Sequence, residues 1–143
     1  MVATVVETNE VEKWLFSTLS LDSIMLALIG SRIYESVAPP ETDYPYVVYQ
    51  YSGGHDVQGI PSVRVMTRTE YLVKAITNEP NSDALVSVVK RIDELLHGAS
   101  GAVGATGYVL SCVRVHPVSL LEIDAGIQYR HRGGVYQIQV QPQ

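Results

Sequence analysis

Residues 26–54, LALIGSRIYESVAPPETDYPYVVYQYSGG, decide how this chain folds. An apolar helical run ends at Gly30, a short Ile33-Tyr34 segment follows, and Pro39-Pro40 lead into a strand rich in tyrosine. The stretch therefore predicts the passage from a helix into a sheet, and it holds no recognisable catalytic grouping.

On either side of this stretch, the apolar pattern changes between helical and strand periods. Helices are expected after the caps Asn9 and Asp22 and over Asp83–His97. Strands are expected at three places, the last of them stopped by Pro117: Tyr46–Ser52, Ser62–Thr77 and Tyr108–Val115. We therefore expect an α+β fold in which two main helices pack on one face of an antiparallel sheet of about four strands.

The last segment, Gly126–Val140, admits two interpretations. Ile127, Tyr129 and His131 share one face, but after Gly133-Gly134 the apolar residues fall at even-numbered positions. A Gly-Gly hairpin and a single strand with a glycine bulge both restore one apolar face, so parity does not choose between them.

The length of 143 residues predicts a single domain over residues 1–143, with residues 1–9 as a flexible N-terminal arm. The single cysteine, Cys112, excludes an internal disulfide and fits a reducing compartment. No signal peptide is recognisable, and no apolar run approaches the ~20 residues of a membrane span. We expect a soluble protein made in the cytoplasm, with no membrane partner.

The excess of negative charge lies in the first part of the sequence. The net charge is −5, and residues 1–43 carry seven acidic residues against two basic ones, whereas the rest of the chain is balanced. No basic patch predicts a nucleic-acid interface. An RNA-binding module is thereby disfavoured, and an acidic surface that aids solubility is the simpler interpretation.

Candidate catalytic and metal-binding residues are isolated from one another. The four histidines fall in separate predicted elements, and none has the spacing of a zinc motif: His55, His97, His116 and His131. Cys112 lies inside a strand pattern, where a cysteine behaves as a small buried hydrophobe. We expect no catalytic residue, no cofactor and no metal. A small α+β enzyme with its pocket near Cys112 or His116 is the alternative from another class.

The residue types that interfaces favour are better represented. Nine of the eleven aromatic residues are tyrosine and seven of the ten basic residues are arginine, and both types bury area while keeping a directed polar end. An ordinary sheet whose tyrosine hydroxyls reach water explains the same composition. The candidate subunit or partner interface comprises eight residues: Tyr49, Tyr51, His55, Arg64, Arg68, Tyr129, Arg130 and Arg132.

Three segments carry a family resemblance: IGSRIY at 29–34, DYPYVVY at 43–49 and the closing YRHRGGVYQIQV at 129–140. They are joined by the strand VRVMTRTEYLVKAIT, the amphipathic helix SDALVSVVKRIDELLHG and a glycine-rich loop. In this order the segments resemble the tail terminator (tail completion) proteins of long-tailed bacteriophages, over residues 10–140.

The resemblance implies a structural virion protein and not an enzyme. Members of this family look like α+β subunits that form a hexameric ring, cap the tail tube and join it to the head connector. The implied partners are further copies of the chain, the tail tube protein and a head–tail connector, adaptor or stopper protein. DNA is expected to pass through the lumen without specific binding. The implied location is the virion tail at the head–tail junction, after assembly in the host cytoplasm.

The nearest alternative to a tail terminator is a head-completion or stopper protein of the same connector. The family pattern also favours Gly126–Val140 as one bent strand in which Gly133-Gly134 is the bulge. A ring needs two different complementary faces on each subunit. We hypothesise that the acidic N-terminal third of one subunit meets arginines of the next, and that the loop around His55 reaches a neighbour or the tube. The arginines concerned are Arg64, Arg68, Arg130 and Arg132.

Overall fold

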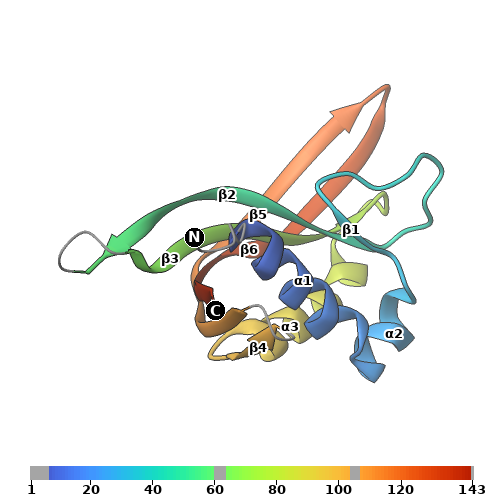
Figure 1. The fold of residues 1–143 in the computed structure, drawn as a ribbon. Coiled ribbons are helices and arrows are strands. Elements are labelled where there is room, and N and C mark those ends of the chain that lie inside the picture. The colour runs from blue at the N-terminus through green and yellow to red at the C-terminus, as the bar shows by residue number, and fades with distance from the viewer. Residues whose placement is uncertain (1–6, 60–63, 104–106, 143) are drawn as a thin grey trace.

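The computed structural model describes residues 7–59, 64–103 and 107–142, which form three helices and six strands (Figure 1). The helices are α1 (Glu7–Ser20), α2 (Ser23–Ile29) and α3 (Asp83–Leu96), and the strands are β1 (Ile33–Glu35), β2 (Tyr46–Gln58), β3 (Arg64–Thr77), β4 (Gly101–Val103), β5 (Gly107–Asp124) and β6 (Ile127–Pro142). Residues 1–6 of the expected N-terminal arm lie outside the described residues, whereas residues 7–9 already belong to α1. The first helix therefore begins before the predicted cap at Asn9.

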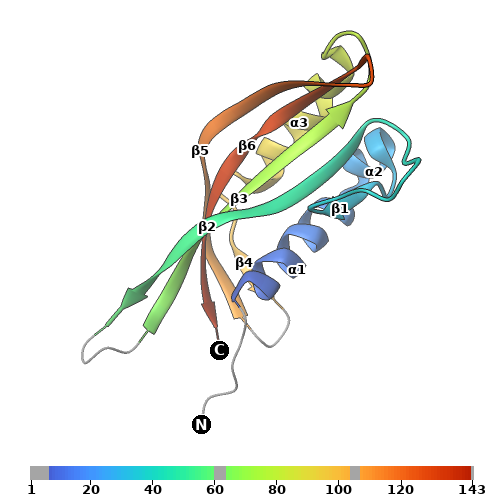
Figure 2. The same cartoon turned by 90° about the horizontal axis from the view of Figure 1, so that it is seen from above.

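All six strands form one mixed sheet in the order β1-β2-β3-β6-β5-β4, which curls into a half-barrel (Figures 1 and 2). β1 pairs with β2 in parallel, and the other neighbouring pairs are antiparallel. The prediction of a four-stranded antiparallel sheet with two packed helices is therefore wrong. The strands β1 and β4 have three residues each, which is too short to show a strand period in the sequence.

Two long hairpins extend beyond the layer of helices, one joining β2 to β3 and the other joining β5 to β6 (Figure 1). The second hairpin exists because β5 continues through Pro117 to Asp124, where the sequence predicts an end. Beyond Val109, β5 pairs with β6 but no longer with β4. A proline whose missing N–H faces the free edge removes no hydrogen bond from the ladder.

The helices cover one face of the sheet and share an apolar core with it (Figure 1). Tyr71 of β3 and Tyr136 of β6 are cross-strand partners on this face, and both side chains are fully buried. Their hydroxyls lie 2.8 Å from Glu12 Oε2 on α1 and 2.9 Å from Asp93 Oδ1 on α3. Burial raises the pKa of both phenols, so each stays a donor and holds one helix against the sheet.

Asp22 fixes the position of α2, as its predicted role of N-cap requires. Its carboxylate accepts a hydrogen bond from Met25 N at 2.9 Å, and it binds Arg91 of α3 through Nε at 2.9 Å and Nη2 at 2.6 Å. The hydrogen bond from Arg91 lowers the pKa of Asp22 to about 2, so the pair stays ionised well below neutral pH. The short helix α2 is thereby tied to α3.

The segment after Ala125 is one strand and not a hairpin, but Gly133-Gly134 is not its bulge. The register of β6 with β3 continues without interruption through both glycines. The irregularities lie in the neighbouring strand β5, at Leu110 and Val115. The two apolar stripes of β6 therefore remain on opposite faces of the sheet, the first outside and the second against the helices.

The two glycines instead permit close packing at the centre of the sheet. A Cβ at Gly133 would lie 2.0 Å from Val73 O of β3, and a Cβ at Gly134 would lie 2.8 Å from Arg114 Cδ of β5. Gly133 thus lets the β3 backbone approach, and Gly134 leaves room for the Arg114 side chain. Arg114 crosses β6 there and places its Nε 3.9 Å from Asp93 Oδ1.

Candidate functional site

The predicted interface tyrosines of β2 have different environments. Tyr49 is buried in the core under the helices. Tyr51 is 47% exposed and lies edge-on to Tyr71, with the ring centroids 5.6 Å apart. Of the two, only Tyr51 offers its surface to a partner.

The charged interface candidates of the β2–β3 hairpin lie farther out along the two strands. His55 and Arg68 are cross-strand partners, so their side chains share one face of the hairpin. The Arg68 Nε is buried and has no hydrogen-bond partner among the described residues. Arg64 pairs its backbone with Gln58, and its side chain lies outside the described part of the chain.

The other three candidates lie on β6, in the second hairpin. Successive side chains of a strand point to opposite faces, so Tyr129 lies on the outer face while Arg130 and Arg132 lie on the face toward the helices. Arg130 donates from Nε to Pro80 O at 3.1 Å, and Arg132 is exposed. The structure therefore divides the eight predicted residues between two hairpins and the core.

A row of four tyrosines crosses the outer face from β1 to β6, and only Tyr129 of this row is among the predicted residues. The ring centroids of Tyr34 and Tyr46 lie 6.2 Å apart, those of Tyr46 and Tyr44 5.3 Å, and those of Tyr44 and Tyr129 6.2 Å. Burial raises the pKa of Tyr44 and Tyr46. The segment DYPY, in the stretch that decides the fold, contains half of this row. The row joins the crossover after β1 to the second hairpin.

His131 and Glu122 form a partly buried contact beside this row. The His131 Nε2 lies 2.9 Å from Glu122 Oε1, and the histidine side chain is 9% exposed. Burial and the nearby charge of Lys74 lower the pKa of His131, against the opposite effect of Glu122. The imidazole is therefore neutral at neutral pH, and its contact with Glu122 joins β6 to β5 within the hairpin.

Acidification below about pH 6.5, the ordinary pKa of histidine, is expected to destabilise the fold through His131. The pKa of His131 is lower in the folded state than in the unfolded chain, so the unfolded chain takes up the proton first as the pH falls. The free energy of unfolding therefore decreases from the ordinary histidine pKa down through the folded-state pKa. Urea unfolding at about pH 7.5 and about pH 5.5 measures the loss. His131→Gln should lose less stability between the two values than the wild type, and an equal loss would exclude His131 as the cause.

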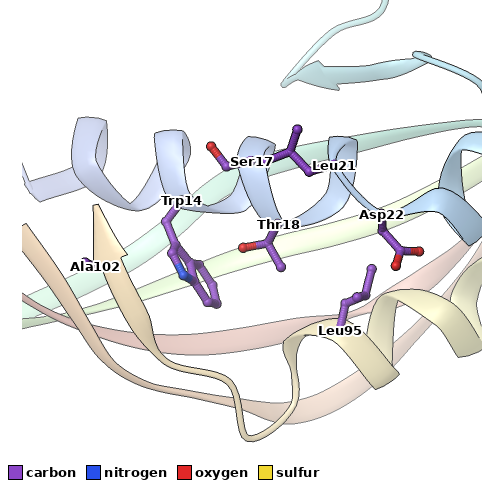
Figure 3. A pocket seen from close by; sticks show the side chains of 7 residues that line it. All are labelled: Trp14, Ser17, Thr18, Leu21, Asp22, Leu95 and Ala102. Atoms are coloured by element: carbon purple, nitrogen blue, oxygen red, sulfur yellow. The ribbon is translucent and has the colours of Figure 1, made fainter. Parts of the chain in front are cut away.

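A pocket between α1, α3 and β4 does not resemble an active site (Figure 3). Its volume is about 410 Å³, and its lining is mostly apolar or hydroxylic: Trp14, Ser17, Thr18, Leu21, Asp22, Leu95 and Ala102. Asp22 is the one ionisable residue of this lining, and its carboxylate is already occupied by Arg91 and the N-terminus of α2. The pocket offers no converging acid and base.

The residues named for an alternative enzyme do not form a catalytic group either. Cys112 is completely buried, and burial raises the pKa of its thiol to about 12, which makes it a poor nucleophile. His116 is exposed, and its Nδ1 contacts Pro117 O at 3.2 Å. Among residues 7–59, 64–103 and 107–142, no three His, Cys, Asp or Glu side chains gather as metal ligands would. None of the helices described is long and apolar enough to span a membrane.

Large apolar side chains are instead exposed along β5, a feature that the sequence analysis missed. Five of them, called here the β5 patch, are at least 40% exposed: Val113, Val115, Leu120, Leu121 and Ile123. Leu120 and Leu121 point to opposite faces of the hairpin, so apolar surface is exposed on both sides of it. These exposed side chains make β5 the candidate interaction surface.

A second apolar surface lies toward the other edge of the sheet, around α2 and the crossover to β2 (Figure 2). Its members, called here the α2 patch, are Leu21, Ile24, Leu26 and Val37, of which Leu21 is 84% and Val37 77% exposed. The link from Asp22 to Arg91 holds α2 in a position that leaves this surface uncovered. The chain thus presents two different apolar surfaces, one on β5 and one around α2.

The acidic surface is smaller than the sequence suggests, and it adjoins the α2 patch. Three of the acidic side chains before residue 44 are engaged within the fold: Glu10 is buried beside Lys13, Glu12 binds Tyr71 and Asp22 binds Arg91. Those at the end of β1 and in the crossover from β1 to β2 are exposed: Glu35, Glu41 and Asp43.

The comparisons with known proteins point to virion tail proteins. The chain matches the family model described as "Tail completion protein gp17" over residues 13–140. Its fold is similar to that of a chain in the solved structure "Virion of native gene transfer agent (GTA) particle", with a TM-score of 0.80 and 14% sequence identity, covering 96% of this chain and 99% of that one. No curated protein matches the chain. Because the family match spans most of its residues, this chain belongs to the tail completion protein gp17 family, and it is a structural component of a phage-like tail.

Proposed function

We propose that this protein is a tail terminator, which assembles with copies of itself into a ring, caps the tail tube and joins it to the head connector. Membership of the tail completion family supports a role in tail assembly. The resemblance to tail terminators supplies the ring, six subunits in number, and the position at the head–tail junction. In this role the protein needs surfaces for its partners and no catalytic site.

The exposed β5 patch is the observation that carries this proposal. Its five apolar side chains lie on an edge strand that extends beyond the helices, and the helices of the same chain do not cover them. Burying apolar surface between subunits is the main driving force of stable association. A hairpin that exposes apolar side chains on both faces suits insertion between other proteins.

The predicted interface residues fit this proposal in two groups. His55 and Arg68 lie together on the β2–β3 hairpin, which we propose reaches a neighbour or the tail tube. Tyr129, Arg130 and Arg132 lie on the β5–β6 hairpin beside the β5 patch. The net charge of −5 on each subunit repels DNA, so DNA in the lumen of such a ring meets no specific binding site.

Electron microscopy of the purified chain mixed with its tail tube protein tests the proposal. We expect rings at the ends of tubes. By light scattering, we expect the protein to have a mass well above that of one chain, either in free solution or once tubes are added. Binding to the head side of the connector and not to tubes would favour a head-completion or stopper protein. A monomer that leaves tube ends uncapped would refute the proposal.

A further inference from the structure

We infer that the β5 patch of one subunit packs against the α2 patch of the next, so that the two edges of the sheet form one repeated contact around the assembly. The inference rests on the proposed ring and names the surfaces that close it. It begins from position: β5 and β1 lie near opposite ends of the strand order, and α2 lies on the β1 side (Figure 2). Two different, complementary patches are what a head-to-tail contact requires.

The free edge of β5 is open from beyond Arg114 to the tip of the β5–β6 hairpin, and only its earlier part is covered. The chain covers its own β5 edge near α3, where Gly98 N donates to Cys112 O at 2.7 Å and Arg114 N donates to His97 Nδ1 at 3.1 Å. In the described part of the chain, β5 beyond Arg114 pairs with β6 alone. Leu120, Leu121 and Ile123 lie on this open part, and Ile123 is 64% exposed. A partner therefore has access to the edge and to both faces.

The α2 side is unfavourable for strand addition, so we expect it to receive side chains and not a strand. At the β1 edge, Ile33 N donates to Ser31 O at 2.8 Å and Val37 N donates to Glu35 O at 2.6 Å. These local bonds use backbone groups that a neighbouring strand would need. What the side offers is the apolar surface of Leu26 and Val37. The expected contact is therefore an apolar hairpin lying against an apolar helix and crossover.

The charges beside the two patches select a contact between unlike surfaces. Glu35, Glu41 and Asp43 are exposed around the α2 patch, whereas Arg132 is exposed beside the β5 patch together with Arg114, whose Nε also lies 3.9 Å from Asp93 Oδ1. The β5–β6 hairpin also carries Glu122, which contacts His131, and Asp124 at its tip. Pairing two α2 patches would bring the carboxylates of the crossover together. Pairing an α2 patch with a β5 patch instead sets them against arginines, which favours the unlike pair.

Two single substitutions and their mixture test the contact. Ile123→Asp disables the β5 patch, Leu26→Asp disables the α2 patch, and Val86→Asp changes a comparably exposed apolar residue outside both. Each patch variant should raise the dissociation constant of the subunits by about 30-fold or more, the size of effect found at central interface residues. Val86→Asp should assemble as the wild type does. All three positions are exposed, and unchanged melting temperatures confirm that the variants fold.

The mixture distinguishes a head-to-tail contact from a symmetric one. Mixed in equal amounts, Ile123→Asp and Leu26→Asp retain one intact pair of patches, so they should form dimers that grow no further. If the β5 patches paired with each other, Leu26→Asp would assemble without Ile123→Asp. The mixture would then form no assembly that Leu26→Asp does not form by itself. Assembly of both patch variants into normal rings would overturn the inference while leaving the proposed function intact. A wild type that neither associates nor caps tubes would overturn both.

Discussion

Gly133→Ala is expected to destabilise the fold by about 3 kcal/mol or more, at or above the upper end of typical overpacking costs. The added Cβ would lie 2.0 Å from Val73 O and 2.6 Å from Lys74 Cα. Both are backbone atoms of β3 at the centre of the sheet, so neither can rotate away as the end of a side chain would. The sheet must separate at this position, with loss of cross-strand hydrogen bonds. Urea unfolding followed by circular dichroism measures the change.

Gly101→Ala provides the matched control for the substitution at Gly133. Its added Cβ would meet nothing closer than Trp14 Nε1 at 3.5 Å, an ordinary contact. We expect a change within about 0.5 kcal/mol, as for substitutions that touch no special feature. If the two variants were equally stable, the close approach of β3 to β6 at Gly133 would be disproved.

Tyr136→Ala is expected to cost about 3–5 kcal/mol, the range for removing a large aromatic side chain from a core. Tyr136 is fully buried between the sheet and the helices, and its hydroxyl donates to Asp93 Oδ1 at 2.9 Å. The alanine variant loses both the packing and the hydrogen bond that holds α3. The same unfolding measurement reports the loss, and the midpoint should fall without a rise in slope.

Tyr136→Phe separates the two contributions, because it keeps the ring and removes the hydroxyl. A hydrogen bond to a charged group contributes about 1.5–3 kcal/mol, and Asp93 is partly exposed and can take water in its place. We therefore expect a loss near the lower end of that range. A phenylalanine variant as unstable as the alanine variant would show that the hydroxyl, and not the packing, dominates at this position.

The long periodic elements could be predicted from the sequence. The helix expected over Asp83–His97 is α3, Asp83–Leu96, and the cap expected at Asp22 accepts a hydrogen bond from Met25 N. Such signals are local, because an apolar stripe or a cap depends on residues within one or two turns. The small edge strands, and the continuation of β5 through Pro117, depend on what lies alongside in the sheet. No local pattern carries that information.

The candidate site was harder to predict, because exposure is decided by which surfaces the fold leaves uncovered. Tyr49 satisfies the composition of an interface residue, yet it is buried under the helices. Leu121 and Ile123 are apolar like core residues, yet both are exposed on β5, whose hairpin with β6 extends beyond the helices (Figure 1). The family resemblance was confirmed because it depends on the order of elements, which survives the divergence of individual residues.

By itself the sequence determined the family, the main helix, the long central strands and the lack of any recognisable catalytic motif. The curl of the sheet, the single strand through Gly133 and Gly134, and the two uncovered patches were decided only by the tertiary structure. The physical reason is that periodicity reports which side chains prefer to be buried, whereas covering a face takes a second element of the same chain. Along β5 beyond Arg114 the described helices do not lie over the strand, and its apolar side chains remain exposed.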